Sequence, residues 1–192
     1  MIEIPSATER LHLPVGQQRQ KFAECRWEQF ALDPMKYLAF NVRTMDQHDH
    51  DNPIKRFPYW RPYFEPLVRI WQFQEPERRL VICKARQMML TWLFCALALW
   101  DAMFHPGRTI VLQSSTYELA LGSSVDGQGL LGRCQFILAH DPFHRFGLVP
   151  KFSALTECIE FEHGSAIIPI AQGAAKIQSM TCSGWFSDEA AL

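Results

Sequence analysis

The sequence has no excess of charge of either sign and no closely spaced cysteines. Its 19 lysines and arginines nearly balance 20 aspartates and glutamates, so the formal net charge is −1. This balance neither indicates nor excludes a nucleic-acid partner. The six cysteines include no Cys-x-x-Cys pair, which disfavours a zinc ribbon and a thioredoxin-type motif. We expect reduced cysteines, as in an intracellular protein.

Segments for export or membrane insertion are also missing. The first ten residues do not have the basic-then-apolar order of a signal peptide. The longest apolar stretch, 88–100, is interrupted by Thr91 and is shorter than the roughly 20 residues that cross a bilayer. We therefore expect a soluble protein with no membrane partner. Its 192 residues, 48% of them hydrophobic, suit a globular domain with a sizeable core.

The composition divides the chain into an N-terminal arm with helices, residues 1–50, and a larger domain, residues 51–192. Apolar residues recur at helical spacing after residue 17 and again after Asp33-Pro34. This dipeptide is typical of an N-cap followed by proline at the first helical position. Two short helices are therefore predicted before residue 45. The polar segment 45–53 marks the boundary, and a further helix is predicted over 65–74.

The larger domain alternates between strand-like and helix-like segments. The continuous apolar run 80–83 predicts a strand buried on both faces of a parallel sheet. Residues 87–104 predict a buried helix, and residues 108–113 predict a second strand. Segments 158–161 and 166–170 suit a hairpin, and a final strand is predicted over 184–187. This order predicts a three-layer α/β domain with a mainly parallel sheet and flanking helices.

The segment 84–91 joins the first predicted strand to the buried helix. Such a junction binds anions, because the first amides of a helix have no acceptor within the helix. Phosphate loops of the GxxxxGK[ST] type use this geometry for nucleotides. Here Thr91 matches the last position, but Lys84 stands in place of the first glycine, and Met89 and Leu90 stand in place of the second glycine and the lysine. On this segment alone, an ordinary basic turn is an equal alternative. The candidate nucleotide-binding residues are Lys84, Ala85, Arg86, Gln87, Met88, Met89, Leu90 and Thr91.

An acidic pair, Asp188 and Glu189, follows the last predicted strand. Phosphate-loop ATPases need a carboxylate at the end of a neighbouring strand for Mg²⁺, and a base beside it that orients water. The alternative is a surface pair that caps a helix. Together with Lys84 and Thr91, the pair favours a fold like that of the P-loop NTPases, with ATP and Mg²⁺ as ligands.

With these motifs the sequence resembles the large subunit of tailed-phage terminases, the ATP-driven motor that packages DNA. The resemblance rests on the loop CKARQMMLTW, on GWFSDEAAL, and on the upstream stretch RFPYWRPYFEPLVRIW. It extends over residues 30–192. The resemblance implies an ATPase that couples hydrolysis to the translocation of double-stranded DNA into a procapsid.

The resemblance also implies a role for each matching residue. Lys84 is expected to act as the phosphate-loop lysine, and Thr91 and Asp188 are expected to hold Mg²⁺. Glu189 is expected to be the general base. Arg86 is expected to contact the γ-phosphate or the site of a neighbouring subunit. In the upstream aromatic stretch, the residues expected beside the adenine are Trp60 and Tyr63.

The partners implied by the resemblance are double-stranded DNA, a terminase small subunit, the portal or procapsid, and further copies of the chain in the intact motor. The implied location is the cytoplasm of the host cell. Terminase large subunits continue past the acidic pair into a nuclease domain, so we expect this chain to be an N-terminal piece. Two alternatives stay open: a DEAD-like helicase ATPase, and a non-catalytic fragment that only binds a partner.

Overall fold

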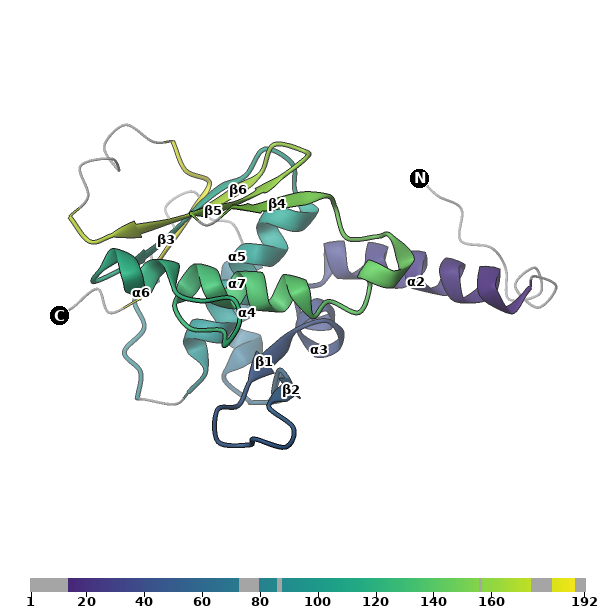
Figure 1. The fold of residues 1–192 in the computed structure, drawn as a ribbon, viewed down its shortest axis with the longest axis horizontal. Coiled ribbons are helices and arrows are strands. Elements are labelled where there is room, and N and C mark those ends of the chain that lie inside the picture. Colours follow the sequence, from purple (N-terminus) through teal and green to yellow (C-terminus); the bar gives the residue numbers. More distant parts are fainter. Residues whose placement is uncertain (1–13, 73–79, 86–87, 156, 174–180, 189–192) are drawn as a thin grey trace.

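The computed structural model describes residues 14–72, 80–85, 88–155, 157–173 and 181–188. It forms a mixed α/β fold in which a five-stranded sheet packs on helices, with a separate two-stranded hairpin (Figure 1). The elements in chain order are α2 (Val15–Leu32), α3 (Pro34–Phe40), β1 (Arg43–Met45), β2 (Ile54–Arg56), α4 (Phe64–Gln72), α5 (Leu90–Phe104), β3 (Thr109–Ser114), α6 (Tyr117–Leu121), α7 (Leu130–Ala139), the 3-10 helix η1 (His144–Phe146), β4 (Phe152–Leu155), β5 (Cys158–Phe161), β6 (Ala166–Ala171) and β7 (Gly184–Ser187).

The two predicted N-terminal helices are confirmed, and Asp33 separates them. Its backbone is extended, with φ −139° and ψ 95°, so α2 ends there. Its side chain then accepts hydrogen bonds from the N–H groups of Met35 (3.0 Å) and Lys36 (3.3 Å), with Pro34 at the first helical position. These bonds satisfy two of the amides that a helix start leaves without a partner. One residue therefore ends α2 and starts α3.

The sheet has the strand order β4-β5-β6-β3-β7. The strand β3 lies between β6 and β7 and runs parallel to both, whereas β4, β5 and β6 pair antiparallel. The predicted hairpin of β5 and β6 is confirmed, as is a final strand over Gly184–Ser187. The prediction of a mainly parallel sheet is wrong, because only two of these four pairings are parallel. Short connections between β4, β5 and β6 impose the antiparallel pairings.

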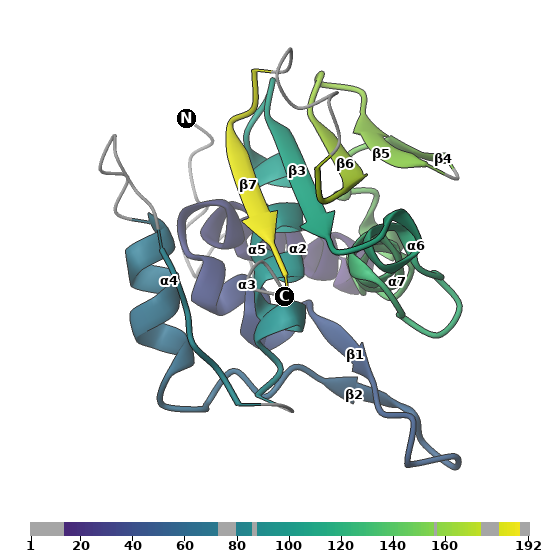
Figure 2. The ribbon, with the colours of Figure 1, turned by 90° about the vertical axis from the view of Figure 1, so that its left-hand side faces the viewer.

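The helix α5 forms the centre of the core. Residues 92–103 are all buried, as expected for a helix that is apolar all round. α5 contacts α7, and both helices contact β3 and β6, so they cover the same side of the sheet (Figure 2). The helix α6 contacts α7 and the same two strands. Among the described residues, the helices that touch the sheet thus form one layer, and the predicted layer on the second face is not found.

The predicted strand at residues 80–83 is wrong. Residues 80–85 form no strand in the structure, and Val81 is 88% exposed. An apolar run forms a strand only where it can pair with a neighbouring strand and bury one of its faces. Within the described residues β7 pairs only with β3. α5 also begins at Leu90 and not at the predicted residue 87, which lies outside the described residues.

The predicted division at residue 50 stays a prediction, although β1 and β2 pair with each other across it, with Thr44 opposite Lys55. None of the helices in the described part of the chain combines the length and the apolar character needed to cross a membrane.

Candidate functional site

The N-terminus of α5 is an uncapped helix start. The preceding residue, Met89, has a left-handed backbone with φ 56° and ψ 21°, and no side chain caps the helix. The first intrahelical bond runs from Leu93 N–H to Met89 O (3.0 Å). The N–H groups of Leu90, Thr91 and Trp92 therefore have no acceptor within the helix, and the helix dipole favours an anion beside them. A left-handed residue that is not glycine costs about 1–2 kcal/mol, so other contacts must hold this turn.

Three residues from two distant parts of the chain, Lys84 and Thr91 from one and Asp188 from the other, meet beside this helix start. Thr91 Oγ1 donates a hydrogen bond to Asp188 Oδ2 (2.8 Å). Lys84 Nζ lies 3.7 Å from Asp188 Oδ1. The Lys84 side chain is 35% exposed and that of Asp188 is 17% exposed. The structure thus brings together a lysine, a threonine hydroxyl and a carboxylate at the positively polarised end of a buried helix.

The strand β7 delivers Asp188 to this place. Asp188 N–H donates to Gln113 O (2.9 Å), which ties the residue to the end of β3. Two residues earlier, the Phe186 ring stacks on Phe94 of α5, with the ring centroids 5.1 Å apart. Phe94 follows Thr91 by three residues, so the two side chains lie on neighbouring positions of one helix face. The stacking therefore fixes the position of β7 along the axis of α5 and places Asp188 beside Thr91.

Tyr63 links the upstream aromatic stretch to the same helix start. Its hydroxyl donates to Met88 O (3.2 Å) and accepts a hydrogen bond from Arg61 Nη1 (2.8 Å). Trp60 lies differently: it is 68% exposed and its ring meets Tyr59 edge-on, with the centroids 5.6 Å apart. Of the two aromatic residues expected beside the adenine, only Tyr63 thus has a described contact with the loop before α5.

The other predicted loop residues differ in what they can offer a ligand. Ala85 is exposed, whereas Met88 and Met89 pack against the core and Leu90 is buried. The side chain of Leu90 therefore faces protein, and only backbone groups there can meet a ligand. Three predicted site residues lie outside the described residues: Arg86, Gln87 and Glu189.

The oxygen atoms of Thr91 and Asp188 suit Mg²⁺, which prefers hard oxygen ligands and is commonly held by one or two carboxylates together with substrate phosphates and waters. Nowhere in the described ranges do three His, Cys, Asp or Glu side chains converge on one point. A cation at this site would therefore take most of its ligands from a bound phosphate and from water.

No protein-family model matches the sequence. No curated protein matches it either. Any proposal about function therefore rests on the residues and their geometry.

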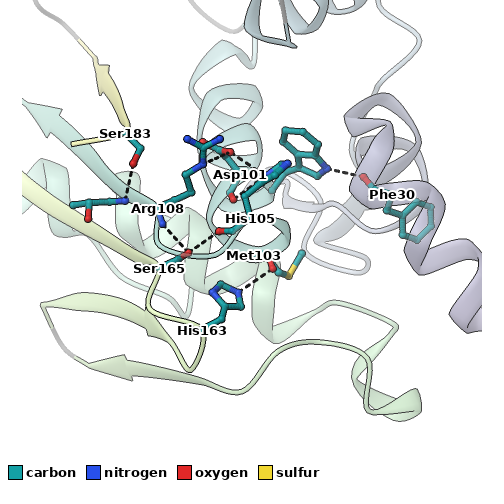
Figure 3. A network of polar contacts seen from close by, with 10 residues as sticks. Phe30, Asp101, Met103, His105, Arg108, His163, Ser165 and Ser183 are labelled. Atoms are coloured by element: carbon teal, nitrogen blue, oxygen red, sulfur yellow. Dashed lines mark hydrogen bonds and ion pairs between the residues drawn. The ribbon is translucent and has the colours of Figure 1, made fainter. Parts of the chain in front are cut away.

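A second polar cluster lies at the opposite end of α5 (Figure 3). Asp101 Oδ1 is 3.0 Å from His105 Nδ1 and 3.4 Å from Arg108 Nε. Burial raises the pKa of Asp101 above its ordinary value, and the charges of Arg108 and His105 oppose that rise. Ser165 Oγ donates to His105 O (2.7 Å) and accepts from Arg108 N–H (3.0 Å).

This cluster contains an aspartate, a histidine and a serine, but its contacts are structural. The Ser165 hydroxyl bonds to backbone atoms and not to the imidazole of His105, whereas a nucleophilic triad requires the serine to bond to the ring. The cluster ties the end of α5 to the starts of β3 and β6. The spacing of Asp101 and His105, four residues apart on a helix, was the only signal of it in the sequence.

A groove of about 610 Å³ opens between α3 and α4, away from these residues. The charged side chains in its wall are already paired, Lys36 with Asp33 and Arg69 with Glu65. Asp33, in its wall, already caps the start of α3, whereas the start of α5 has no side-chain cap, so we place the candidate site at the start of α5. The residues that line the groove are Leu32, Asp33, Met35, Lys36, Ala39, Phe40, Tyr59, Glu65, Arg69 and Gln72.

Proposed function

We propose that the chain binds ATP with Mg²⁺ at the N-terminus of α5. The observation that carries this proposal is the pair of contacts made by Asp188. This carboxylate touches both Lys84 and Thr91 of the predicted phosphate loop, although Thr91 lies 97 residues away in the sequence. A lysine, a hydroxyl and a carboxylate around free helix amides are the groups with which proteins hold a magnesium-bound triphosphate.

Each group has a separate task in this proposal. The amides of Leu90, Thr91 and Trp92, which have no acceptor within the helix, donate to phosphate oxygens, and the Lys84 ammonium neutralises their charge. The oxygens of Thr91 and Asp188 would hold the cation, which when bound would neutralise charge on the transferred phosphoryl group. Lys84 is able to leave Asp188 for a phosphate, because an exposed ion pair of this kind contributes only about 0.2–1 kcal/mol.

The proposal also includes hydrolysis of the bound ATP and the coupling of this hydrolysis to DNA translocation. Glu189, next to Asp188 in the sequence, would orient the attacking water as the general base. The resemblance to terminase large subunits then supports an ATPase module that drives double-stranded DNA into a procapsid. Its partners would be the small subunit, the portal and further copies of the chain. The loop and acidic motifs support this reading, and Arg86 would contact the γ-phosphate or a neighbouring site.

The test is a titration of a fluorescent ATP analogue with Mg²⁺ into the wild type, Lys84→Ala and Lys151→Ala. Lys151 is a matched control because it is exposed and stands in the loop before β4. The loss of a charge-assisted contact, worth about 1.5–3 kcal/mol, should weaken binding about 10- to 100-fold in Lys84→Ala. Lys151→Ala should bind like the wild type. Equal affinity of all three proteins would remove the loop from the proposal.

A further inference from the structure

The left-handed turn at Met89 has a support outside the loop. The carbonyl of the preceding residue, Met88, accepts a hydrogen bond from the Tyr63 hydroxyl (3.2 Å). The peptide group between Met88 and Met89 is planar and trans, so its N–H points opposite to its carbonyl. Tyr63 therefore fixes the plane of this peptide and directs the Met89 N–H away from itself. That peptide leads directly into the amides at the start of α5 that have no acceptor within the helix.

The direction of the Tyr63 hydroxyl proton is determined by Arg61. A guanidinium can only donate hydrogen bonds, and Arg61 Nη1 donates to the Tyr63 oxygen at 2.8 Å. The hydroxyl proton is thus left for the acceptor on the other side, Met88 O. The two hydrogen bonds therefore point the same way, from the Arg61 guanidinium through the Tyr63 hydroxyl to the Met88 carbonyl. A charged donor at the start of such a series strengthens both bonds.

The ring of Tyr63 is itself held in place. It meets Phe64 edge-on, with the centroids 4.7 Å apart. Phe64 is fully buried and stacks on the equally buried Phe57 (4.8 Å). Tyr63 is therefore anchored in the core at one end and bonded to the loop at the other. A backbone conformation that is unfavourable for a residue with a side chain persists only where surrounding structure enforces it, and Tyr63 supplies such a contact.

We propose that Tyr63 is a positioning residue for the phosphate loop, acting through the Met88 carbonyl, and that it does not recognise the adenine. The inference rests on the proposed function, since it assumes that the start of α5 binds phosphates. It predicts that the Tyr63 hydroxyl contributes equally to the binding of every ligand with a triphosphate, whether or not the ligand carries a base.

Tyr63→Phe tests this inference, because it removes the hydroxyl and leaves the ring. Tyr59→Phe is the control, since Tyr59 is exposed and meets only Trp60 among the described rings. Calorimetry would compare Mg-ATP, Mg-tripolyphosphate and adenosine. In Tyr63→Phe, the loss of one hydrogen bond should lower the affinity for ATP and for tripolyphosphate by the same factor, about 3- to 10-fold. Tyr59→Phe should bind both ligands with the affinity of the wild type. A loss for ATP alone would identify a base contact and overturn the inference.

Hydrogen exchange of the amides of residues 89–92 gives a second readout that needs no ligand. These amides should exchange faster in Tyr63→Phe than in the wild type, because the turn loses its outside support. Unchanged exchange overturns the inference. If the wild type binds neither ATP nor tripolyphosphate, the proposed function fails and the inference fails with it. If the wild type binds both and Tyr63→Phe binds them equally well, only the inference fails.

Discussion

Replacing Thr91 with valine removes one hydroxyl and little volume, so it isolates the hydrogen bond to Asp188. That bond is 2.8 Å long, and a hydrogen bond to a charged group contributes about 1.5–3 kcal/mol. Asp188 is 17% exposed, so water replaces part of the bond and the lower end, about 1.5 kcal/mol, applies. The Lys84–Asp188 pair is longer, 3.7 Å, and Lys84 is 35% exposed. Its expected contribution is about 0.2–1 kcal/mol.

Two double-mutant cycles measure these couplings separately. Asp188→Ala is combined with Thr91→Val in one cycle and with Lys84→Ala in the other, and urea denaturation gives the free energy of unfolding of each protein. Asp188→Ala leaves the backbone bond to Gln113 O in place, so β7 should stay paired. We expect about 1–2 kcal/mol of coupling for Thr91 and a smaller value for Lys84. A coupling near zero for Thr91, or a larger one for Lys84, would refute the reasoning.

Two further predictions concern stability away from the site. Asp33→Ala removes the N-cap of α3 and should cost about 1 kcal/mol, which lowers the melting temperature by about 2–4 °C in a chain of this size; an unchanged melting temperature would contradict the capping role. Burial raises the pKa of Asp101 above its ordinary 3.8, so the folded chain keeps this proton to higher pH than the unfolded chain does. The free energy of unfolding of the wild type, relative to Asp101→Asn, should therefore fall as the pH rises above that ordinary value. Parallel pH profiles from urea denaturation would show that this carboxyl does not titrate differently on folding.

The elements that depend on local pattern were predictable. The Asp33-Pro34 break, the buried helix α5 and the strand β7 each follow from capping chemistry or from apolar runs of the right length. The sheet was less predictable, because residues 80–83 have the composition of a strand and pair with nothing in the described structure. Parallel and antiparallel pairing depend on the connections between strands, which single-strand patterns do not encode. The short strand β4 was missed for the same reason.

The candidate site also combines features that the sequence predicts with features that it does not. Lys84 and Thr91 belong to one sequence motif and Asp188 to another, and the contact between the two motifs depends on β7 lying parallel to β3 beside α5. The contact of Tyr63 with Met88 O could not be foreseen, because a bond to a backbone carbonyl depends on the conformation of the loop and not on the type of residue there. Sequence motifs name side chains, whereas the free amides at the start of α5 arise from the backbone alone.

The most direct test of the proposed nucleotide site is a structure of the chain bound to a non-hydrolysable ATP analogue and Mg²⁺. The proposal predicts the triphosphate against the amides of Leu90, Thr91 and Trp92, with the cation beside Thr91 and Asp188. Lys84 should have moved from Asp188 to a phosphate oxygen. An analogue bound in the groove between α3 and α4, or phosphates that do not touch the start of α5, would contradict the proposal.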